Sequence, residues 1–291
     1  MNSLHYGLTP KMKPLSPKRT AVIAALDIGT TKIACLIARL KPNGPNEVLP
    51  RRSHAVEVIG FSHTGARGMK SGAVVDLVDA EEAIRHAVDL AERAANVQVD
   101  AVLVSMSAGR IASEQIAASI SMKGATVTEQ DIARVVGAGA AGSVKEGRVL
   151  LHTVPMGFSI DDANGIRDPR GMMGQRFGAD LHLVSADLAA CRNLMLTIER
   201  CHLDIEAMVA SPYVAALSTL AGDEADVGAA VIDMGAGTTT KREFGSSGFR
   251  PAIYLKRFVC PPPVASAFGA ASGLFRPKFC TCHVSSSPSP A

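Results

Sequence analysis

The sequence predicts an α/β fold for this chain of 291 residues, on the basis of three observations. Apolar, strand-like runs alternate with segments of helical periodicity, which is typical of α/β proteins. An apolar run that ends in Asp-x-Gly occurs twice, at 25–31 (ALDIGTT) and at 231–239 (VIDMGAGTT), with the two Asp residues 206 positions apart. Hydrophobic residues make up 47% of the chain but aromatic residues only 4%, so the core is expected to be aliphatic.

The first part of the chain is predicted to contain strands around one long helix. Residues 21–40 are expected to form a hairpin that closes at the first Asp-x-Gly turn, and 55–61 a third strand. The helix at 79–96 has Asp79 as its expected N-cap. Further strands are expected at 97–107 and, from a weaker pattern, at 111–120. The apolar face of the helix contains Ile84, Ala87, Val88, Ala91 and Ala94.

The second part continues the alternation of helices and strands. Thr128-x-x-Asp131 predicts a capping-box start for a short helix to about Val136. Strands are expected at 149–154 and 181–185, and Ser185 can cap a helix that runs to about Cys201. A helix at 209–220, which contains a Pro near its start, is followed by a strand at 227–234 that carries the second Asp-x-Gly turn.

The first Asp-x-Gly turn contains groups that could bind a polyphosphate and its metal ion. Gly29 lets the backbone approach a ligand closely, because it has no Cβ. Thr30, Thr31 and Lys32 offer backbone N–H groups, hydroxyls and one cation, and successive N–H groups in a turn form an anion-binding concavity. The carboxylate of Asp27 is suited to hold Mg²⁺ through water, since Mg²⁺ dehydrates reluctantly.

The second turn offers a matching set. Gly235 and Gly237 permit close approach, and Thr238 and Thr239 supply hydroxyls. Asp233 is expected to orient a water or the metal ion on the other side of the γ-phosphate. One such turn is equally consistent with an ordinary hairpin, because Asp and Gly also favour turns for local reasons. Two copies favour an ATP-binding clamp, which is neither a Walker loop nor a dinucleotide fingerprint.

Charge and cysteine content argue against several classes. The net charge of +3 comes from 241–291, which holds seven basic residues and one acidic residue. Residues 1–240 carry a net charge of −3, which gives no support for nucleic-acid binding. The six cysteines form no Cys-x-x-Cys pair, and Cys35, Cys191 and Cys201 are expected to be small core residues.

The two ends of the chain differ from its middle. Residues 1–20 carry four basic residues and three Pro without an apolar segment, and are expected to be a disordered basic arm rather than a signal peptide. Residues 241–291 contain seven of the twelve aromatic residues, no Asp, and a final Ser/Pro run. A disordered tail is normally poor in aromatic residues. The hypothesis that follows is an aberrant, unstructured tail translated out of frame; a genuine Pro-rich tail is the alternative.

Segments around and between the two turns resemble the FtsA family of bacterial cell-division proteins, within the superfamily of actin, sugar kinases and DnaK-type chaperones. The resemblance covers about 20–240 and implies an actin-like (ribonuclease-H-like) fold with an inserted α/β subdomain. Subdomain 1A would comprise 20–79 and 172–220, the inserted subdomain 1C 80–171, and the start of subdomain 2A 226–240. The matching segments are 26–34 (LDIGTTKIA), 67–72 (RGMKSG), 76–77 (DL), 165–171 (GIRDPRG), 199–201 (ERC), 211–213 (SPY) and 232–239 (IDMGAGTT).

The resemblance implies a cytoplasmic protein, peripheral on the inner face of the membrane, that binds ATP and Mg²⁺ and self-associates. It would tether the FtsZ ring, recruit other division proteins, and be at most a weak ATPase. Compared with the family, the second half is expected to be incomplete: the rest of 2A, the FtsZ-docking subdomain 2B, the adenosine-binding motif and the amphipathic membrane helix would be absent. Two alternatives stay open, an ATP-dependent small-molecule kinase of the same superfamily and a non-functional frameshifted product.

Overall fold

The computed structural model describes residues 15–43, 54–107, 109–220 and 229–244. A five-stranded sheet, in the order β11-β6-β1-β2-β3, forms the first layer. The hairpin expected at 21–40 is present, and it continues into an antiparallel third strand, whereas β6 and β11 add to β1 in parallel. The strands are β1 (Ala21–Ile28), β2 (Lys32–Pro42), β3 (His54–Gly65), β6 (Ala101–Met106) and β11 (Asp204–Ala210).

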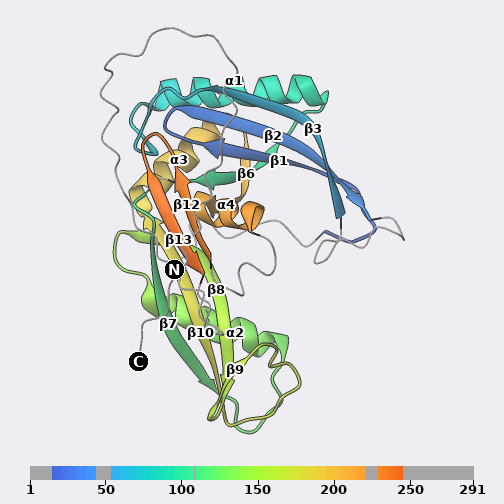
Figure 1. The fold of residues 1–291 in the computed structure, drawn as a ribbon, viewed down its shortest axis with the longest axis vertical. Coiled ribbons are helices and arrows are strands. Elements are labelled where there is room, and N and C mark those ends of the chain that lie inside the picture. The colour runs from blue at the N-terminus through green and yellow to red at the C-terminus, as the bar shows by residue number, and fades with distance from the viewer. Residues whose placement is uncertain (1–14, 44–53, 108, 221–228, 245–291) are drawn as a thin grey trace, which may run out of the picture. The chain divides into compact units, whose positions relative to one another are not determined.

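Two helices, α1 (Leu77–Ala95) and α3 (Leu188–Arg200), pack against this sheet, and Figure 1 shows α1 lying across β2 and β3. The core between them is aliphatic, as expected, and contains Cys35 and Cys191, both 0% exposed. Four of the five residues predicted for the apolar face of α1 are buried, while Ala94 is exposed.

The expected N-caps of these two helices were wrong by a few residues. Asp76, not Asp79, accepts the backbone N–H groups of the first turn of α1. Asp187, not Ser185, does the same for α3, because β10 extends through Asp187 and carries Ser185 inside the strand. Each segment contains more than one residue that can act as an N-cap. The point at which the backbone turns from extended to helical decides which of them does so.

A four-stranded sheet, in the order β7-β10-β8-β9, packs against α2 (Glu129–Ser143). Its own core is centred on Phe177, Leu181 and Leu183. The predicted capping box of Thr128 and Asp131 is confirmed, although α2 runs past Val136. The strands are β7 (Ala112–Ser121), β8 (Arg148–Ile160), β9 (Ala163–Ile166) and β10 (Arg176–Asp187).

The pairing of these strands supports a proposal for the bounds of the inserted unit that differs from the 80–171 expected from the resemblance. Strand β6 belongs to the five-stranded sheet and helix α1 packs against that sheet, whereas β10 pairs with both β7 and β8. We therefore propose that the inserted unit spans 112–187. A small hairpin, β4 (Met69–Lys70) with β5 (Ala73–Val74), lies between β3 and α1 in the chain.

The last described elements are α4 (Ser211–Thr219) and the two-stranded sheet of β12 (Ala229–Met234) and β13 (Thr239–Phe244). The predicted helix at 209–220 begins at Ser211 because residues 204–210 form the edge strand β11, which the sequence pattern did not reveal. Strand pairing in β13 continues to Phe244, past Thr240, where the pattern was expected to break. The rest of the predicted tail and most of the predicted arm, 245–291 and 1–14, lie outside the described residues.

Candidate functional site

The two Asp-x-Gly segments form turns of the same construction. In the first, Ile28 pairs with Ile33, and the N–H of Gly29 donates to the carbonyl oxygen of Lys32 at 3.0 Å. In the second, Met234 pairs with Thr239, and the N–H of Gly235 donates to the carbonyl oxygen of Thr238 at 2.8 Å. Each hairpin therefore closes with four residues between its paired ends, and the sequence repeat is also a structural repeat.

The aspartates that precede these turns line one cavity of about 350 Å³. Asp27 comes from β1 and Asp233 from β12, although they are far apart in the sequence. Burial and the nearby charge of Asp27 raise the pKa of Asp233, while Lys32 acts in the opposite direction. The other lining residues are small, aliphatic or hydroxylic: Ala25, Leu26, Ala34, Leu36, Ser105, Ser211, Val214 and Ala215.

The second turn is in direct contact with the first. A Cβ built on Gly237 would overlap the hydroxyl of Thr30 and lie 3.0 Å from the Cα of Ser71, so only glycine fits at this position. Thr238 is buried, and its hydroxyl lies 3.2 Å from the hydroxyl of Ser107, the residue that follows β6. The predicted residues Thr30, Gly237 and Thr238 are thus brought together.

A third loop, which the sequence reasoning did not assign to the site, supports the first turn. The backbone N–H of Gly72 donates to the hydroxyl of Thr30 at 2.9 Å, and Gly72 is buried. Ser71 and Gly72 both have positive φ, 50° and 75°. The Ser-Gly pair within the segment 67–72 was a sequence signal for a tight turn, but nothing in the sequence linked that turn to Thr30.

The remaining predicted residues are Thr31, Lys32 and Thr239. The side chains of Thr31 and Lys32 are exposed, and the carbonyl oxygen of Thr31 accepts the N–H of Ala66 at 2.9 Å. The backbone of Thr239 begins β13, while its side chain lies outside the described part of the structure. The two serines of the cavity wall, Ser105 and Ser211, were not predicted; their hydroxyls lie 3.0 Å apart.

The site is suited to Mg²⁺ with a polyphosphate. Two facing carboxylates, one of them partly desolvated, repel one another, and a divalent cation would relieve that repulsion. Mg²⁺ typically uses one or two carboxylates, its own waters and substrate phosphates, so a larger cage of protein ligands is not required. No group of three or more His, Cys, Asp or Glu side chains with metal-site geometry occurs among the described residues.

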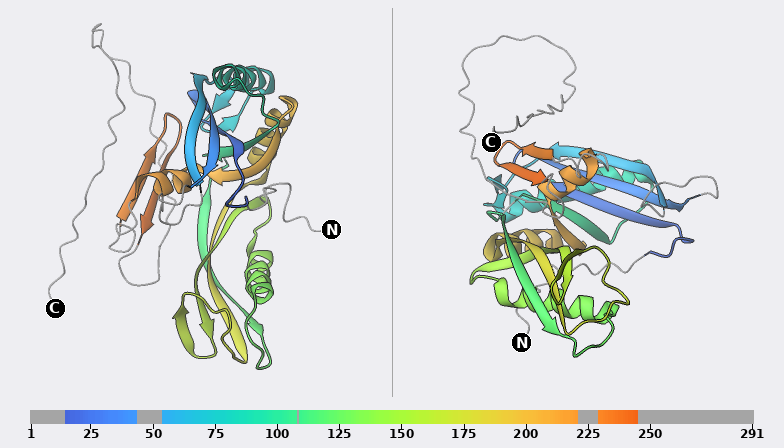
Figure 2. Two further views of the ribbon diagram at one scale, coloured as in Figure 1. Left: turned by 90° about the vertical axis from the view of Figure 1, so that its right-hand side faces the viewer. Right: turned by 60° about the horizontal axis from the view of Figure 1, so that its bottom comes forward.

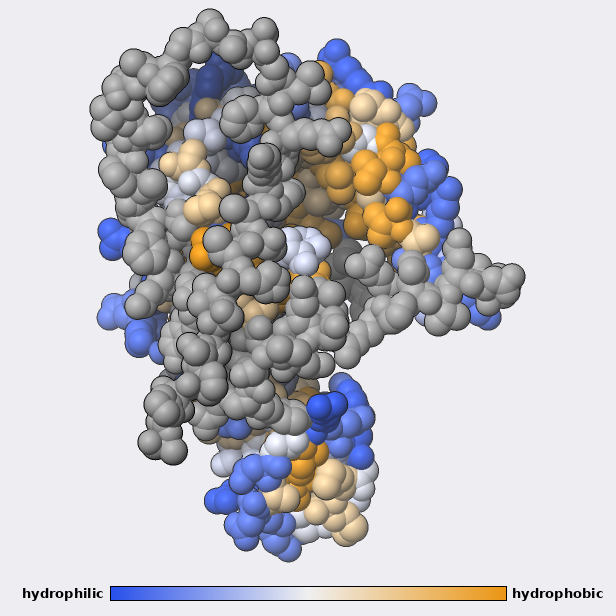
Figure 3. Space-filling model, viewed as in Figure 1, coloured by the Kyte–Doolittle hydropathy of each residue, from blue (hydrophilic) through white to orange (hydrophobic). Residues whose placement is uncertain are grey.

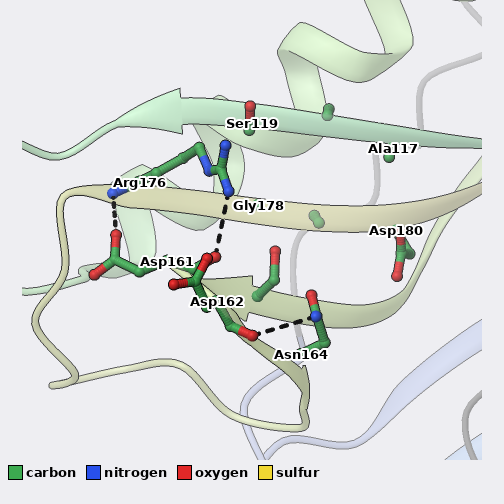
Figure 4. Close-up of a pocket in the computed structure, with 11 residues that line it drawn as sticks. Ala117, Ser119, Asp161, Asp162, Asn164, Arg176, Gly178 and Asp180 are labelled. Carbon is green, nitrogen blue, oxygen red and sulfur yellow. Dashed lines mark hydrogen bonds between the residues drawn. The ribbon is translucent and has the colours of Figure 1, made fainter.

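A second cavity, of about 290 Å³, lies on the inserted sheet (Figure 4). It contains none of the predicted phosphate-binding residues, and two of its polar side chains bond to nearby backbone groups. The carboxylate of Asp161 accepts the backbone N–H groups of Gln175 and Arg176, at 3.0 and 2.8 Å. The side-chain amide of Asn164 donates to the carbonyl oxygen of Asp162 at 3.4 Å.

One patch of exposed hydrophobic residues lies on the first sheet. Figure 3 shows hydrophobic residues gathered over the part formed by β1, β2 and β3. Val22, Val56, Val58 and Phe61 are between 42% and 57% exposed. None of the described helices is both long enough and apolar enough to cross a lipid bilayer.

Comparison with known proteins places these features in a family context. Residues 108–185 match the family described as the SHS2 domain inserted in FtsA. The cell division protein FtsA of Agrobacterium fabrum is 47% identical over 238 residues, which are 82% of this chain and 54% of that protein. FtsA of Escherichia coli is 29% identical over 250 residues, 85% of this chain and 57% of that protein. This chain therefore spans about half the length of the curated relatives that it matches.

The fold has a counterpart among solved structures. A chain of the PilM–PilN type IV pilus biogenesis complex superposes with a TM-score of 0.51 at 13% identity, covering 81% of this chain and 60% of that chain. At this identity the likeness concerns the fold alone. The predicted actin-like α/β fold is confirmed, and so is the resemblance to FtsA.

Proposed function

We propose, from the similarity to FtsA over 238 residues, that this chain acts in bacterial cell division as an actin-like, ATP-binding scaffold. The observation that carries the proposal is the contact between the two turns, in which Gly237 packs on Thr30 while Asp27 and Asp233 line one cavity. Turns of this kind, facing one another, offer phosphate-binding groups on two sides of a single ligand.

In this proposal, ATP binds with Mg²⁺. The N–H groups and hydroxyls of the turns, with the ammonium of Lys32, would hold the phosphates. Asp27 and Asp233 would hold Mg²⁺ through water, and the ion would neutralise phosphate charge. Of the described residues that line the cavity, these two aspartates are the ones with titratable side chains. With both assigned to the metal, neither serves as the base that a small-molecule kinase needs, which favours a scaffold with slow turnover.

The proposed cellular role follows the family. The scaffold would self-associate, contribute to assembly of the FtsZ ring on the cytoplasmic face of the inner membrane, and recruit further division proteins. The inserted unit, which carries the match to the domain inserted in FtsA, is the proposed contact region for such proteins.

Titration with a fluorescent ATP analogue, with and without Mg²⁺, tests the nucleotide site. Saturable Mg²⁺-dependent binding is expected, with a loss of about tenfold or more when Asp27→Asn or Asp233→Asn removes a charge that pairs with the metal. Asp162→Asn, an exposed carboxyl at the second cavity, is the matched control and should bind like the unchanged chain. If all three variants bind the analogue with the affinity of the unchanged chain, this cavity is not the nucleotide site.

Two assays distinguish the scaffold function from the kinase function. One is co-sedimentation with FtsZ polymers, and the other is ADP release in the presence of a panel of sugars. ADP release stimulated by a small-molecule acceptor would reject the scaffold. FtsZ-dependent sedimentation without such stimulation would support it.

A further inference from the structure

Among the described residues, strand β11 lies at the edge of the five-stranded sheet and pairs on one side only, with β6. An edge strand presents N–H groups that no neighbouring strand can satisfy. Ala210, the last residue of β11, donates its N–H to Nε2 of His152 at 3.0 Å. His152 belongs to β8, so a side chain of the inserted unit accepts one N–H at the edge of the first sheet.

The same imidazole holds the first turn of α4. Its ring stacks on Tyr213, with centroids 5.1 Å apart and an interplanar angle of 28°. Ala210 is the N-cap of α4 and has no side-chain oxygen to bind the first N–H groups, and Pro212 follows at the start of the helix. His152 therefore contacts both the residue before α4 and the helix itself.

Helix α4 is in turn a wall of the candidate nucleotide site. Ser211, Val214 and Ala215 line the cavity that contains the two aspartates. The helix also contacts β12 and β13, the hairpin that carries Asp233, and Figure 2 shows α4 between this hairpin and the first sheet. A shift of α4 would move one wall of the cavity and the support of the second turn together.

We propose that His152 is a positioning residue that couples the inserted unit to the nucleotide site through the start of α4. Because Nε2 accepts a hydrogen bond, the imidazole must be neutral with its proton on Nδ1. Coupling of this kind is reciprocal. A ligand at the cavity changes the affinity of the inserted unit for its partner, and that partner changes the affinity of the cavity for its ligand by the same factor. The nucleotide part of this inference rests on the proposed function, whereas the link between β8 and α4 does not.

Amide hydrogen exchange of the ligand-free chain tests the link itself. His152→Phe keeps an aromatic ring against Tyr213 but offers no acceptor to Ala210. Exchange in 211–219 and 229–234 is expected to become roughly three- to tenfold faster, the range for losing one hydrogen bond. His63→Phe, at an exposed histidine of β3 that stacks on Phe61, is the matched control and should leave both segments unchanged. Unchanged exchange in His152→Phe would overturn the proposal.

A second variant protects the test against a simple loss of folding. His152→Gln retains an acceptor oxygen and is expected to restore slow exchange at least in part, with the circular dichroism spectrum of the unchanged chain. If Gln and Phe accelerate exchange equally, the acceptor is irrelevant and the proposal fails.

Mg²⁺–ATP titration followed by exchange separates this inference from the proposed function. If the unchanged chain binds no Mg²⁺–ATP, the proposed function fails, and the ligand-free exchange still decides the link through His152. If it binds, nucleotide should alter exchange in 148–160 and 176–187, and His152→Phe should abolish that response while His63→Phe keeps it. A response that persists in His152→Phe would refute the coupling.

Discussion

The contact between the two turns can be tested by placing a single methyl group at Gly237. An alanine Cβ there would overlap Oγ1 of Thr30 and lie 2.9 Å from its Cγ2 and 3.0 Å from the Cα of Ser71. Relieving the overlap requires Thr30 to move, and Thr30 is the acceptor for the buried N–H of Gly72. Gly237→Ala is therefore expected to separate the turns and to leave Gly72 without its partner.

The magnitude follows from these two losses. Overpacking a well-filled contact costs about 1–3 kcal/mol, and a buried N–H without an acceptor costs about 1–3 kcal/mol. Both costs act through the Thr30 side chain and are not additive. We therefore expect docking of the second turn to be weakened by about 2–4 kcal/mol. Affinity for a fluorescent Mg²⁺–ATP analogue should fall by about 30-fold or more, and amide exchange in β12 should accelerate.

A double-mutant cycle isolates the contact. In a Thr30→Ala background the overlapping atoms are already absent, and Gly237→Ala should then cost only about 0–1 kcal/mol, so the coupling energy is about 1–4 kcal/mol. Gly235→Ala is the control, because its added Cβ would lie 3.2 Å from the Thr238 carbonyl oxygen, within its own turn. If Gly237→Ala costs the same with and without the Thr30 side chain, the two turns do not meet as described.

Three further outcomes are expected. Asp233→Asn should stabilise the ligand-free chain at pH 7, because burial and Asp27 raise the pKa of Asp233. A raised carboxyl pKa means that the folded state binds the proton more tightly, so the free energy of unfolding falls as pH rises from about 4 through the raised pKa. The stabilisation by Asn should therefore fade toward pH 4. Urea melts at several pH values measure this, and an equal gain at all pH values would contradict it. Burial raises the pKa of Cys35 to about 11 and that of Cys191 to about 12. Iodoacetamide at pH 8 should therefore modify both thiols far more slowly in the folded chain than in urea, as measured by peptide mass spectrometry. Comparable rates in the two conditions would argue against their burial. Thr128→Ala removes the capping box of α2 and should lower the free energy of unfolding by about 1 kcal/mol, with Thr128→Ser as a control that keeps the hydroxyl; a change below about 0.2 kcal/mol would show that the cap is not formed.

Local signals predicted most of the elements. The alternation in 21–40 and the Asp-x-Gly turns depend on residues close in sequence, and so does the capping box of Thr128 and Asp131. Strand β11 was missed because its apolar residues run directly into those of α4, so the two periodicities merge and only Pro212, at the start of the helix, marks the change. The N-caps were misplaced because neighbouring residues are chemically equivalent candidates.

Pairing between distant segments could not be predicted in the same way. The bounds proposed for the inserted unit depend on the pairing of β10 with β7 and β8, and on the parallel pairing of β6 with β1. Many strands of similar composition could pair in principle, and the choice is made by the packing of the whole sheet. The serines of the cavity wall and the Ser71–Gly72 loop joined the site for the same reason, since each reaches it from a different part of the chain.

By itself, the sequence determined the α/β class, the aliphatic core and the chemistry of the two turns, because periodicity, composition and short motifs are properties of neighbouring residues. Only the tertiary structure decided that Asp27 and Asp233 line one cavity, that Gly237 lies on Thr30, and that His152 reaches the start of α4. These contacts join residues between 58 and 207 positions apart. Their formation depends on how the sheets pack, which no local pattern encodes.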